Sequence, residues 1–362
     1  MLPLRHSFRI SMAFLGLLVP LLSSGCGSAP DEPPVSIGVA PPEALEAPVQ
    51  EVRERLRAVA EQGVAVSVAL ARGGEILWSE AHGYAHAEEH SPATPETRFR
   101  IYSVVKPMTA VAAARLMEAG RLDPNASVQR YVPEVAEHLA AVTAMQLATH
   151  TSGIRHYADE AEGRNLQHCE SVEDALALFS MDPLVHAPGE RETYSSWGFV
   201  LLSAVIQGVG EEPFPEVMRR LVFEPAGMVS TVPDDPGRSM EHRAAFYRET
   251  EAGAMEPEAP VDNTCKWGAG GFVSTAEDVA HFGQAMIDGS LISEPSQQLF
   301  LRGSSVYSAQ GIGAGGTAFL IVDAEHGLAV SLLANVSGNT VGPALQELVW
   351  DIHRGVAGGG GD

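Results

Sequence analysis

One stretch separates two differently patterned parts of this chain: Phe99-Arg100-Ile101-Tyr102-Ser103-Val104-Val105-Lys106-Pro107. Proline is tolerated in a helix only in its first turn, so Pro107 predicts that a helix begins near Ser103. Ser103 would then lie at the positive end of the helix dipole, with Lys106 one turn further on the same face. A serine hydroxyl becomes a nucleophile when a base lies beside it, and a partly buried neutral lysine can serve. The spacing alone is a weak signal, because chance also places a serine three residues before a lysine.

Strand patterns lie toward both ends of the chain, and helix patterns lie between them. Alternating apolar residues predict strands at 64–70 and 76–79 near the start and at 317–322 and 328–335 near the end. Helical spacing is found at 46–60, 108–118, 172–179, 197–207, after a Thr275–Asp278 capping box, and around 345–352. We therefore expect an α+β fold, in which an antiparallel sheet built from both chain ends is flanked by helices. The sheet region would comprise 46–102 and 268–356, with a mostly helical region inserted at 103–267.

Two further segments carry candidate site residues. Tyr194-Ser195-Ser196 precedes the apolar helix pattern at 197–207, where the local residues by themselves favour a helix N-cap beside a core aromatic residue. The glycine-rich stretch Gly311–Gly316 leads into the strand predicted at 317–322. Glycines before a strand let a substrate or another backbone come close, although an ordinary loop has the same composition.

Taken in this order, the three motifs resemble those of the serine β-lactamase-related family, which includes class C β-lactamases, D-Ala-D-Ala peptidases and esterases. The resemblance extends from about residue 49 to 352 and includes Phe99-Arg100-Ile101, Met117-Glu118-Ala119-Gly120-Arg121-Leu122-Asp123, Leu147-Ala148-Thr149-His150-Thr151-Ser152-Gly153-Ile154, Pro188-Gly189 and Val222-Phe223-Glu224-Pro225-Ala226-Gly227-Met228. Arg155-His156-Tyr157 makes the chain similar to the branch of the mitochondrial serine β-lactamase-like protein. The resemblance implies a β-lactamase/transpeptidase-like sandwich of helices and sheet.

The same resemblance implies a serine hydrolase that forms an acyl-enzyme and needs no metal or cofactor. Ser103 would attack a carbonyl carbon, and Lys106 would take the hydroxyl proton. Tyr194 would protonate the leaving group and later activate water.

The oxyanion would lie between the backbone N–H of Ser103 and one on the Gly311–Ala314 strand. Ser196, Gly311 and Ile312 are therefore the expected oxyanion and substrate-binding residues. By the same resemblance His150 is expected to bond backbone in a turn rather than act as a base. Lys266 is expected in a loop near the cleft, without a catalytic role.

The chain departs from the family at the third motif, where relatives have Lys or His, then Ser or Thr, then Gly. Ala309-Gln310-Gly311 stands there, so the glycine is kept and the basic residue is missing. The stretch before this strand also looks shortened, beginning around Arg302-Gly303-Ser304. Losing such a contact commonly lowers a rate about a hundredfold or more.

Three function classes follow from these motifs and this departure. The leading hypothesis is hydrolysis of a β-lactam, a peptidoglycan peptide, a D-amino-acid peptide or an ester, and the residues do not choose among them. The alternative is a catalytically impaired family member that binds cell-wall peptide or a partner protein. A polysaccharide-processing enzyme is disfavoured, because no pair of carboxylates stands out from the acidic background.

Composition and the N-terminus bear on partners and location. The net charge of −23 disfavours nucleic acid, which such a surface would repel. A basic start, an apolar run at 12–22 and Leu22-Ser23-Ser24-Gly25-Cys26 resemble a lipoprotein signal, so we expect a signal peptide at 1–25, lipidation of Cys26 and attachment to a membrane facing the periplasm or cell exterior. Residues 26–45 would be a flexible tether and 357–362 a disordered tail. Cys169 and Cys265 could pair in such a compartment, but the sequence leaves this open, as it does the oligomeric state.

Overall fold

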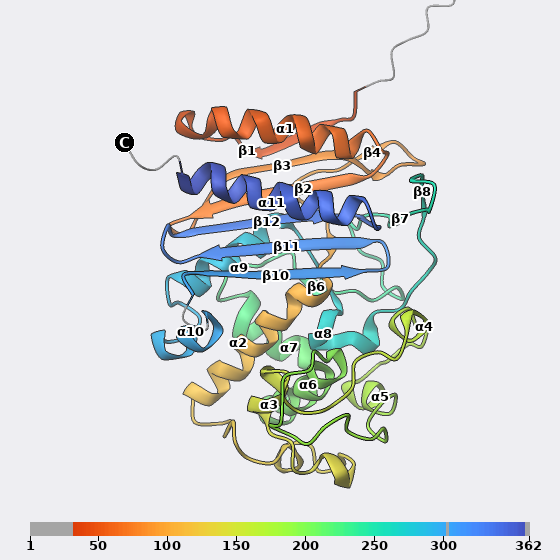
Figure 1. Ribbon diagram of the computed structural model, residues 1–362, viewed down its shortest axis with the longest axis vertical. Helices are drawn as coiled ribbons and strands as arrows, with labels where there is room; N and C mark the ends of the chain where they lie inside the picture. Colours follow the sequence, from red (N-terminus) through yellow and green to blue (C-terminus); the bar gives the residue numbers. More distant parts are fainter. Residues whose placement is uncertain (1–31, 302–303, 359–362) are drawn as a thin grey trace, which may run out of the picture. The chain divides into compact units, whose positions relative to one another are not determined.

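The computed structural model describes residues 32–301 and 304–358, and its main feature is an antiparallel sheet (Figure 1). In spatial order its strands are β1 (Val35–Val39), β3 (Glu75–His86), β2 (Ala65–Arg72), β12 (Leu328–Ala334), β11 (Gly316–Asp323) and β10 (Val306–Gly313), with β4 (Ser91–Pro92) paired to β3. At its centre β2 from the first part of the chain pairs with β12 from the last, from Arg72 opposite Leu328 to Val66 opposite Ala334. The prediction of one sheet assembled from both chain ends is confirmed.

Helices cover both faces of this sheet. They are η1 (Glu43–Leu45), α1 (Glu46–Ala60) and α11 (Val341–Gly358) on one face, and α9 (Ala276–Ile287) on the other, followed in the chain by α10 (Glu294–Leu301). The alternation along β2 explains the two faces, because Val66, Val68 and Leu70 pack toward α1 and α11 while Ala65 and Ala69 face α9. Small side chains on that second face let α9 approach closely.

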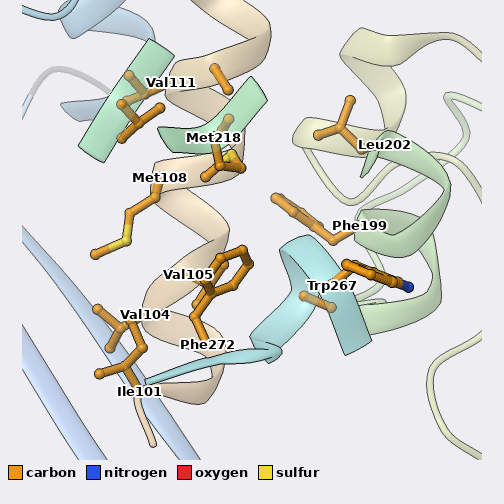
Figure 2. Packing of buried hydrophobic residues seen from close by; sticks show 14 of the residues in the cluster. Ile101, Val104, Val105, Met108, Val111, Phe199, Leu202, Met218, Trp267 and Phe272 are labelled. Atoms are coloured by element: carbon orange, nitrogen blue, oxygen red, sulfur yellow. The ribbon is translucent and has the colours of Figure 1, made fainter. Parts of the chain in front are cut away.

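The inserted region is mostly helical, as expected. Its helices are η2 (Tyr102–Val104), α2 (Val105–Glu118), η3 (Val128–Arg130), η4 (Glu137–Leu139), α3 (Ala144–Ala148), α4 (Glu160–Gly163), α5 (Val172–Leu176), α6 (Ser196–Gly210), α7 (Phe214–Met218), η5 (Arg219–Phe223), η6 (Thr264–Lys266) and α8 (Trp267–Gly270). Two small sheets link the regions, one of β5 (Phe99–Arg100), β9 (Phe272–Ser274) and β6 (Val232–Pro233), and one of β13 (Val336–Ser337), β7 (Tyr247–Glu249) and β8 (Met255–Pro257). Figure 2 shows α2 with Phe199 of α6 on one side and the side chain of Met108 directed to the opposite side, both within the same buried cluster. This packing fixes α2 in the centre of the molecule.

The structure differs from the expected boundaries at both ends of the folded part. Residues 35–39 lie inside the expected tether 26–45, yet they form β1 and pair with β3 from Val35 opposite His82. An edge strand needs only backbone pairing, and β3 would otherwise present unpaired backbone groups. Helix α11 runs to Gly358, into the expected tail 357–362, because Val356 is still buried. The expected signal peptide and Cys26 lie outside the described residues, and within the described part no helix is both long and apolar enough to cross a membrane.

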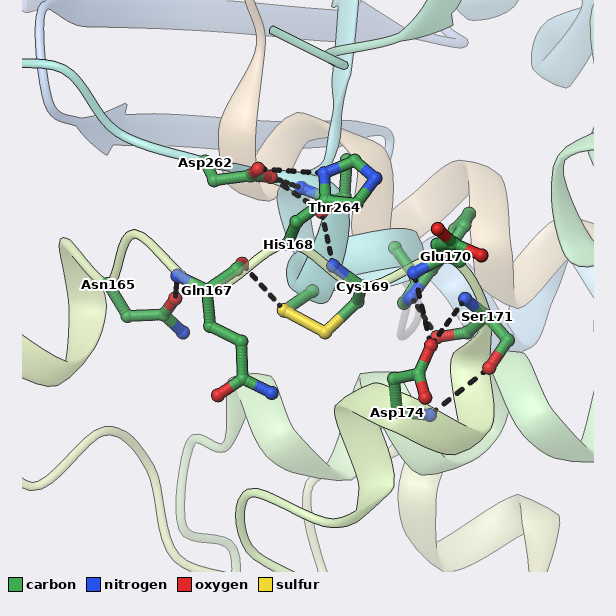
Figure 3. The surroundings of a disulfide bond; sticks show 11 residues. Asn165, Gln167, His168, Cys169, Glu170, Ser171, Asp174, Asp262 and Thr264 are labelled. Carbon is green, nitrogen blue, oxygen red and sulfur yellow. Dashed lines mark hydrogen bonds and ion pairs between the residues drawn. A yellow bond between two sulfur atoms is a disulfide. The ribbon is translucent and has the colours of Figure 1, made fainter. Parts of the chain in front are cut away.

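Cys169 and Cys265 form a disulfide, which answers the question that the sequence left open (Figure 3). The bond joins the loop before α5 to η6 across 96 residues of chain. Closing a loop of this length removes unfolded-state entropy worth up to about 4.7 kcal/mol. His168 Nδ1 and Asp262 Oδ2, 2.9 Å apart, add an ion pair between the same two segments when the histidine is protonated. The segment that carries Lys266 is thereby tied to the helical region.

Candidate active site

Ser103 lies in η2, immediately before α2, and its neighbours hold it in place. Ile101 and Val104 are fully buried against the core (Figure 2), whereas Ser103 is half-buried. Tyr102, the residue immediately before Ser103, has a φ of 41°, a left-handed conformation that a bulky residue rarely adopts. Such strain persists only where the surroundings over-determine it, and it is common at functional sites.

The structure brings the three predicted catalytic side chains together. Lys106 Nζ lies 2.9 Å from Ser103 Oγ and also donates to the backbone oxygen of Ala269 at 2.8 Å. Tyr194 Oη lies 2.7 Å from Ser103 Oγ on the other side. Ser103 Oγ is therefore within hydrogen-bond distance of both groups that could remove its proton.

The surroundings lower the pKa of both candidate bases. Burial disfavours the charged form of Lys106 and lowers its pKa, against the opposing effect of Tyr194. Partial burial is the largest influence and raises the pKa of Tyr194, but the charge of Lys106 and hydrogen bonds with Lys106, Ser103 and Ser196 together outweigh it, so the net shift is downward. A lysine and a tyrosine whose pKa values move toward neutrality are suited to proton transfer.

The hairpin of β10 and β11 runs beside Ser103 and supplies the second oxyanion donor. Gly313 pairs with Gly316 across a two-residue turn, so bonded and non-bonded pairs alternate from there along the ladder. Gly311 opposite Ala318 is then a bonded pair, and the N–H of Ile312 points away from β11. We infer that the N–H groups of Ser103 and Ile312 form the oxyanion hole.

Gly311 has a different role from the expected one. Its N–H is directed to β11 rather than to a substrate, by the alternation just described. A Cβ built on Gly311 would lie only 2.1 Å from the carbonyl oxygen of Ile101. Glycine is therefore needed so that β10 can pass close to the nucleophile segment.

Ser196 lies at the start of α6 and lines the cleft, and its role in binding substrate stays a prediction. Its N–H donates to His156 Nδ1 at 3.2 Å. The neighbouring Ser195 is the N-cap, since its hydroxyl accepts from the N–H of Gly198 at 2.8 Å, which confirms the capping interpretation of this segment. Sequence reasoning gave no role to His156, whose ring lies against Tyr194 with centroids 5.2 Å apart and whose pKa is lowered by burial and by Lys106.

His150 has the structural role that was expected. Its Nδ1 accepts from the N–H of Ser195 at 3.2 Å, in a turn where His150 itself has a φ of 59°. The ring also lies against Tyr194, with 4.7 Å between ring centroids. We infer that this ring contact helps to position Tyr194.

Ser103 and Tyr194 open onto a cleft of about 810 Å³, whereas Lys106 is buried and does not line it. Its lining includes Tyr102, Ser103, His156, Asp159, Glu160, Arg164, Tyr194, Ser196, Arg248, Glu249, Lys266, Gln310, Ile312 and Asn339. Gln310 stands there where relatives have the second residue of the third motif. Within residues 32–301 and 304–358 no group of His, Cys, Asp and Glu is arranged to hold a metal ion.

Comparison with known proteins agrees with this arrangement. The model of the beta-lactamase family matches residues 52–354, which is most of the chain. The chain belongs to the beta-lactamase family. Other members and fold relatives show how varied its chemistry is.

The chain is 30% identical over 300 residues to the mitochondrial serine beta-lactamase-like protein LACTB of Bos taurus, covering 63% of this chain and 53% of that protein. It is 33% identical over 210 residues to esterase EstB of Burkholderia gladioli, covering 52% of this chain and 53% of that protein. The chain thus spans about half the length of these two relatives. The D-amino acid amidase of Ochrobactrum anthropi, solved with D-phenylalanine, shares the fold with a TM-score of 0.74, at 21% identity over 86% of this chain and 99% of that one.

Proposed function

We propose that this member of the beta-lactamase family is a serine hydrolase that works through an acyl-enzyme. The observation that carries the proposal is the position of Ser103 Oγ, 2.9 Å from Lys106 Nζ and 2.7 Å from Tyr194 Oη at the edge of the cleft. An inactive descendant would not need to keep a buried lysine beside a serine, because burying an amine without a task is costly.

In the proposed reaction Ser103 Oγ forms a bond to the substrate carbonyl carbon while its proton passes to neutral Lys106. The carbonyl oxygen becomes negative and accepts from the N–H groups of Ser103 and Ile312. Collapse breaks the bond to the leaving group, which takes a proton from Tyr194, and Tyr194 is reprotonated from Lys106. Water then attacks the acyl-enzyme with the same groups acting in reverse, and free Ser103 is restored.

The substrate is proposed to be an amide, β-lactam or ester that derives from the cell wall. An esterase among the relatives and an amidase with the same fold support this range. The alternative, a binder of cell-wall peptide or of a partner protein, is favoured by one observation. Ala309 leaves the third motif without a cation, and its small side chain packs against the core.

Covalent probes separate the two functions. We expect a fluorophosphonate to label the wild-type protein, and peptide mapping by mass spectrometry to place the adduct on Ser103, because only an activated serine reacts. A fluorescent penicillin run in parallel reports whether a β-lactam also acylates the same residue. Absence of both labels, or an adduct on another serine, would contradict the hydrolase proposal and favour the binder.

We further propose that the protein is exported and held on a membrane by lipidated Cys26. The basic start and apolar run before Cys26 support this, and a disulfide between Cys169 and Cys265 is compatible with an oxidising compartment. Cys26→Ser should therefore move the protein from the membrane fraction to the soluble fraction after cell lysis. Unchanged membrane partitioning of this variant would refute the anchor.

A further inference from the structure

The cleft keeps a buried cation although its third motif lacks one. Arg248 pairs with Glu256, and nearly half of each side chain is exposed. Arg164 pairs with Glu160 and with buried Glu258. These two cations of the cleft are therefore already neutralised by carboxylates of the protein itself.

Lys266 differs from both arginines. Only 5% of it is exposed, and Nζ donates to the neutral amide oxygen of Asn263 at 2.6 Å. Nζ also lies 5.4 Å from the ring centroid of Tyr102, the residue before the nucleophile. An ammonium group has three N–H donors. One amide acceptor and one ring face therefore leave a donor that can bind a ligand. A buried lysine at the wall of a cleft with a neutral acceptor is incompletely compensated, because buried charges are normally paired.

Several features hold Lys266 in place. The adjacent Cys265 is bonded to Cys169 (Figure 3), so the backbone is covalently tied on one side. On the other side Trp267 has a φ of 31°, a strained conformation for a large side chain. Asn263, the acceptor of Lys266, donates in turn to Asp234 at 2.6 Å. Rigid support of this kind is typical of binding side chains rather than of surface lysines.

The carboxylate of Asp234 is shared by other groups and does not neutralise Lys266 directly. It accepts from Arg100 Nε at 2.8 Å and from Arg243. Arg100 also donates to the carbonyl oxygen of Ala314, as does Tyr102 Oη at 2.7 Å. The network thus fixes the β10–β11 turn next to Ile312, and within residues 32–301 and 304–358 no carboxylate forms an ion pair with Lys266.

We propose that Lys266 binds a carboxylate of the substrate and so replaces the cation missing at Ala309. The inference rests on the proposed hydrolase function and narrows it to acyl donors that carry a free carboxylate near the scissile bond. The bound carboxylate would accept from Lys266 Nζ in a charge-assisted hydrogen bond. Lys266 is in this sense a specificity-determining residue that does not take part in proton transfer.

The pKa of Lys266 is also what we expect of a cation that binds an anionic ligand. Burial, together with the charge of Arg100, lowers its pKa to about 8, and Arg164 adds to this effect, while Asp234 and Asp262 oppose it. Besides these charged groups, the amide oxygen of Asn263 and the ring of Tyr102 face Nζ. A bound carboxylate would raise the pKa again, because an opposite charge favours the ammonium form. Binding of an anionic substrate should therefore weaken as the pH rises above about 8.

Two esters with the same leaving group test the proposal: 4-nitrophenyl hydrogen glutarate, which carries a carboxylate, and 4-nitrophenyl valerate, which is neutral and similar in length. Lys266→Met should lower kcat/KM for the anionic ester about 10- to 100-fold, mainly through KM, and change that for the neutral ester less than about threefold. For the wild type, KM for the anionic ester alone should rise above pH about 8. Lys266→Arg, which keeps the positive charge, should retain part of the preference for the anionic ester that Lys266→Met loses.

Arg248→Met is the matched variant, since it removes another cation of the same cleft. Equal losses on both esters after Lys266→Met, or a selective loss after Arg248→Met instead, would overturn the proposal. If the wild type hydrolyses neither ester, the hydrolase function fails, and calorimetric titration of the Ser103→Ala protein with glutarate still tests Lys266. Binding lost on adding Lys266→Met supports the carboxylate site, and binding that is absent or unaffected refutes it.

Discussion

Ser103→Ala should lower kcat/KM for an activated ester by about a thousandfold or more, leaving little above the uncatalysed rate. The substitution removes the oxygen that forms the covalent bond. Tyr194 Oη is 2.7 Å away, but it belongs to the proton-transfer pair. Some residual rate is expected, because the N–H groups of the oxyanion hole remain.

The measurement is release of 4-nitrophenol by purified protein, with the thermal midpoint Tm as a check of folding. Tm should stay close to that of the wild type, since Ser103 is half-buried and its Oγ contacts only polar partners. Ser239→Ala, an exposed serine outside the cleft, is the control. If Ser103→Ala keeps more than about a tenth of the wild-type rate, another nucleophile must operate.

Much of the fold could be predicted because local pattern and tertiary packing agree. The helix predicted at 46–60 is α1 with the same bounds, since its apolar residues face the sheet at helical spacing. Ser103 and Lys106 could likewise be placed, because Pro107 restricts where the helix can begin. The spacing of three residues then brings their side chains together without any long-range information.

The features that were missed depend on long-range pairing. The strand β1 has a short alternation of Val35, Ile37 and Val39, but it is only five residues long, and its pairing with the edge of β3 is a long-range contact that the local pattern does not show. The predicted capping box at Thr275 is half right: Thr275 accepts from the N–H of Asp278, but the Asp278 carboxylate bonds to Ser230 and Thr231 instead. Residues far apart in sequence compete for the same carboxylate, and no local motif reveals which one wins.

In the candidate site, too, local motifs predict some residues, whereas others depend on long-range contacts. Motifs identified Ser103, Lys106 and Tyr194, but the choice between Gly311 and Ile312 as oxyanion donor needs the hairpin register, because successive N–H groups of a strand point to opposite sides. The disulfide also required the fold, since two cysteines 96 residues apart allow pairing without demanding it. The unusual environment of Lys266 arises from Asn263, Asp234 and Tyr102, which only the tertiary structure assembles.

Lys106→Arg should lower kcat/KM for the neutral ester by about 10²- to 10⁴-fold, although it keeps the positive charge. Arginine stays protonated in proteins and cannot accept the proton of Ser103. Lys106→Met should cause a similar loss, because both variants lack a base. Comparison of the two on 4-nitrophenyl valerate separates a need for a base from a need for charge. Activity of Lys106→Arg near that of the wild type would show that Lys106 acts only as a cation.

The pH dependence gives an independent test of Lys106 in the wild-type protein. The base must be neutral to act, so kcat/KM should rise with pH as Lys106 loses its proton. Burial lowers its pKa from the ordinary lysine value of 10.5, so this rise should occur well below pH 10.5. The neutral ester is used, since binding of the anionic one also reports on Lys266. A rise centred near the ordinary lysine value would mean that Lys106 is not desolvated in the working enzyme, and Tyr194 would then be the stronger candidate for the base.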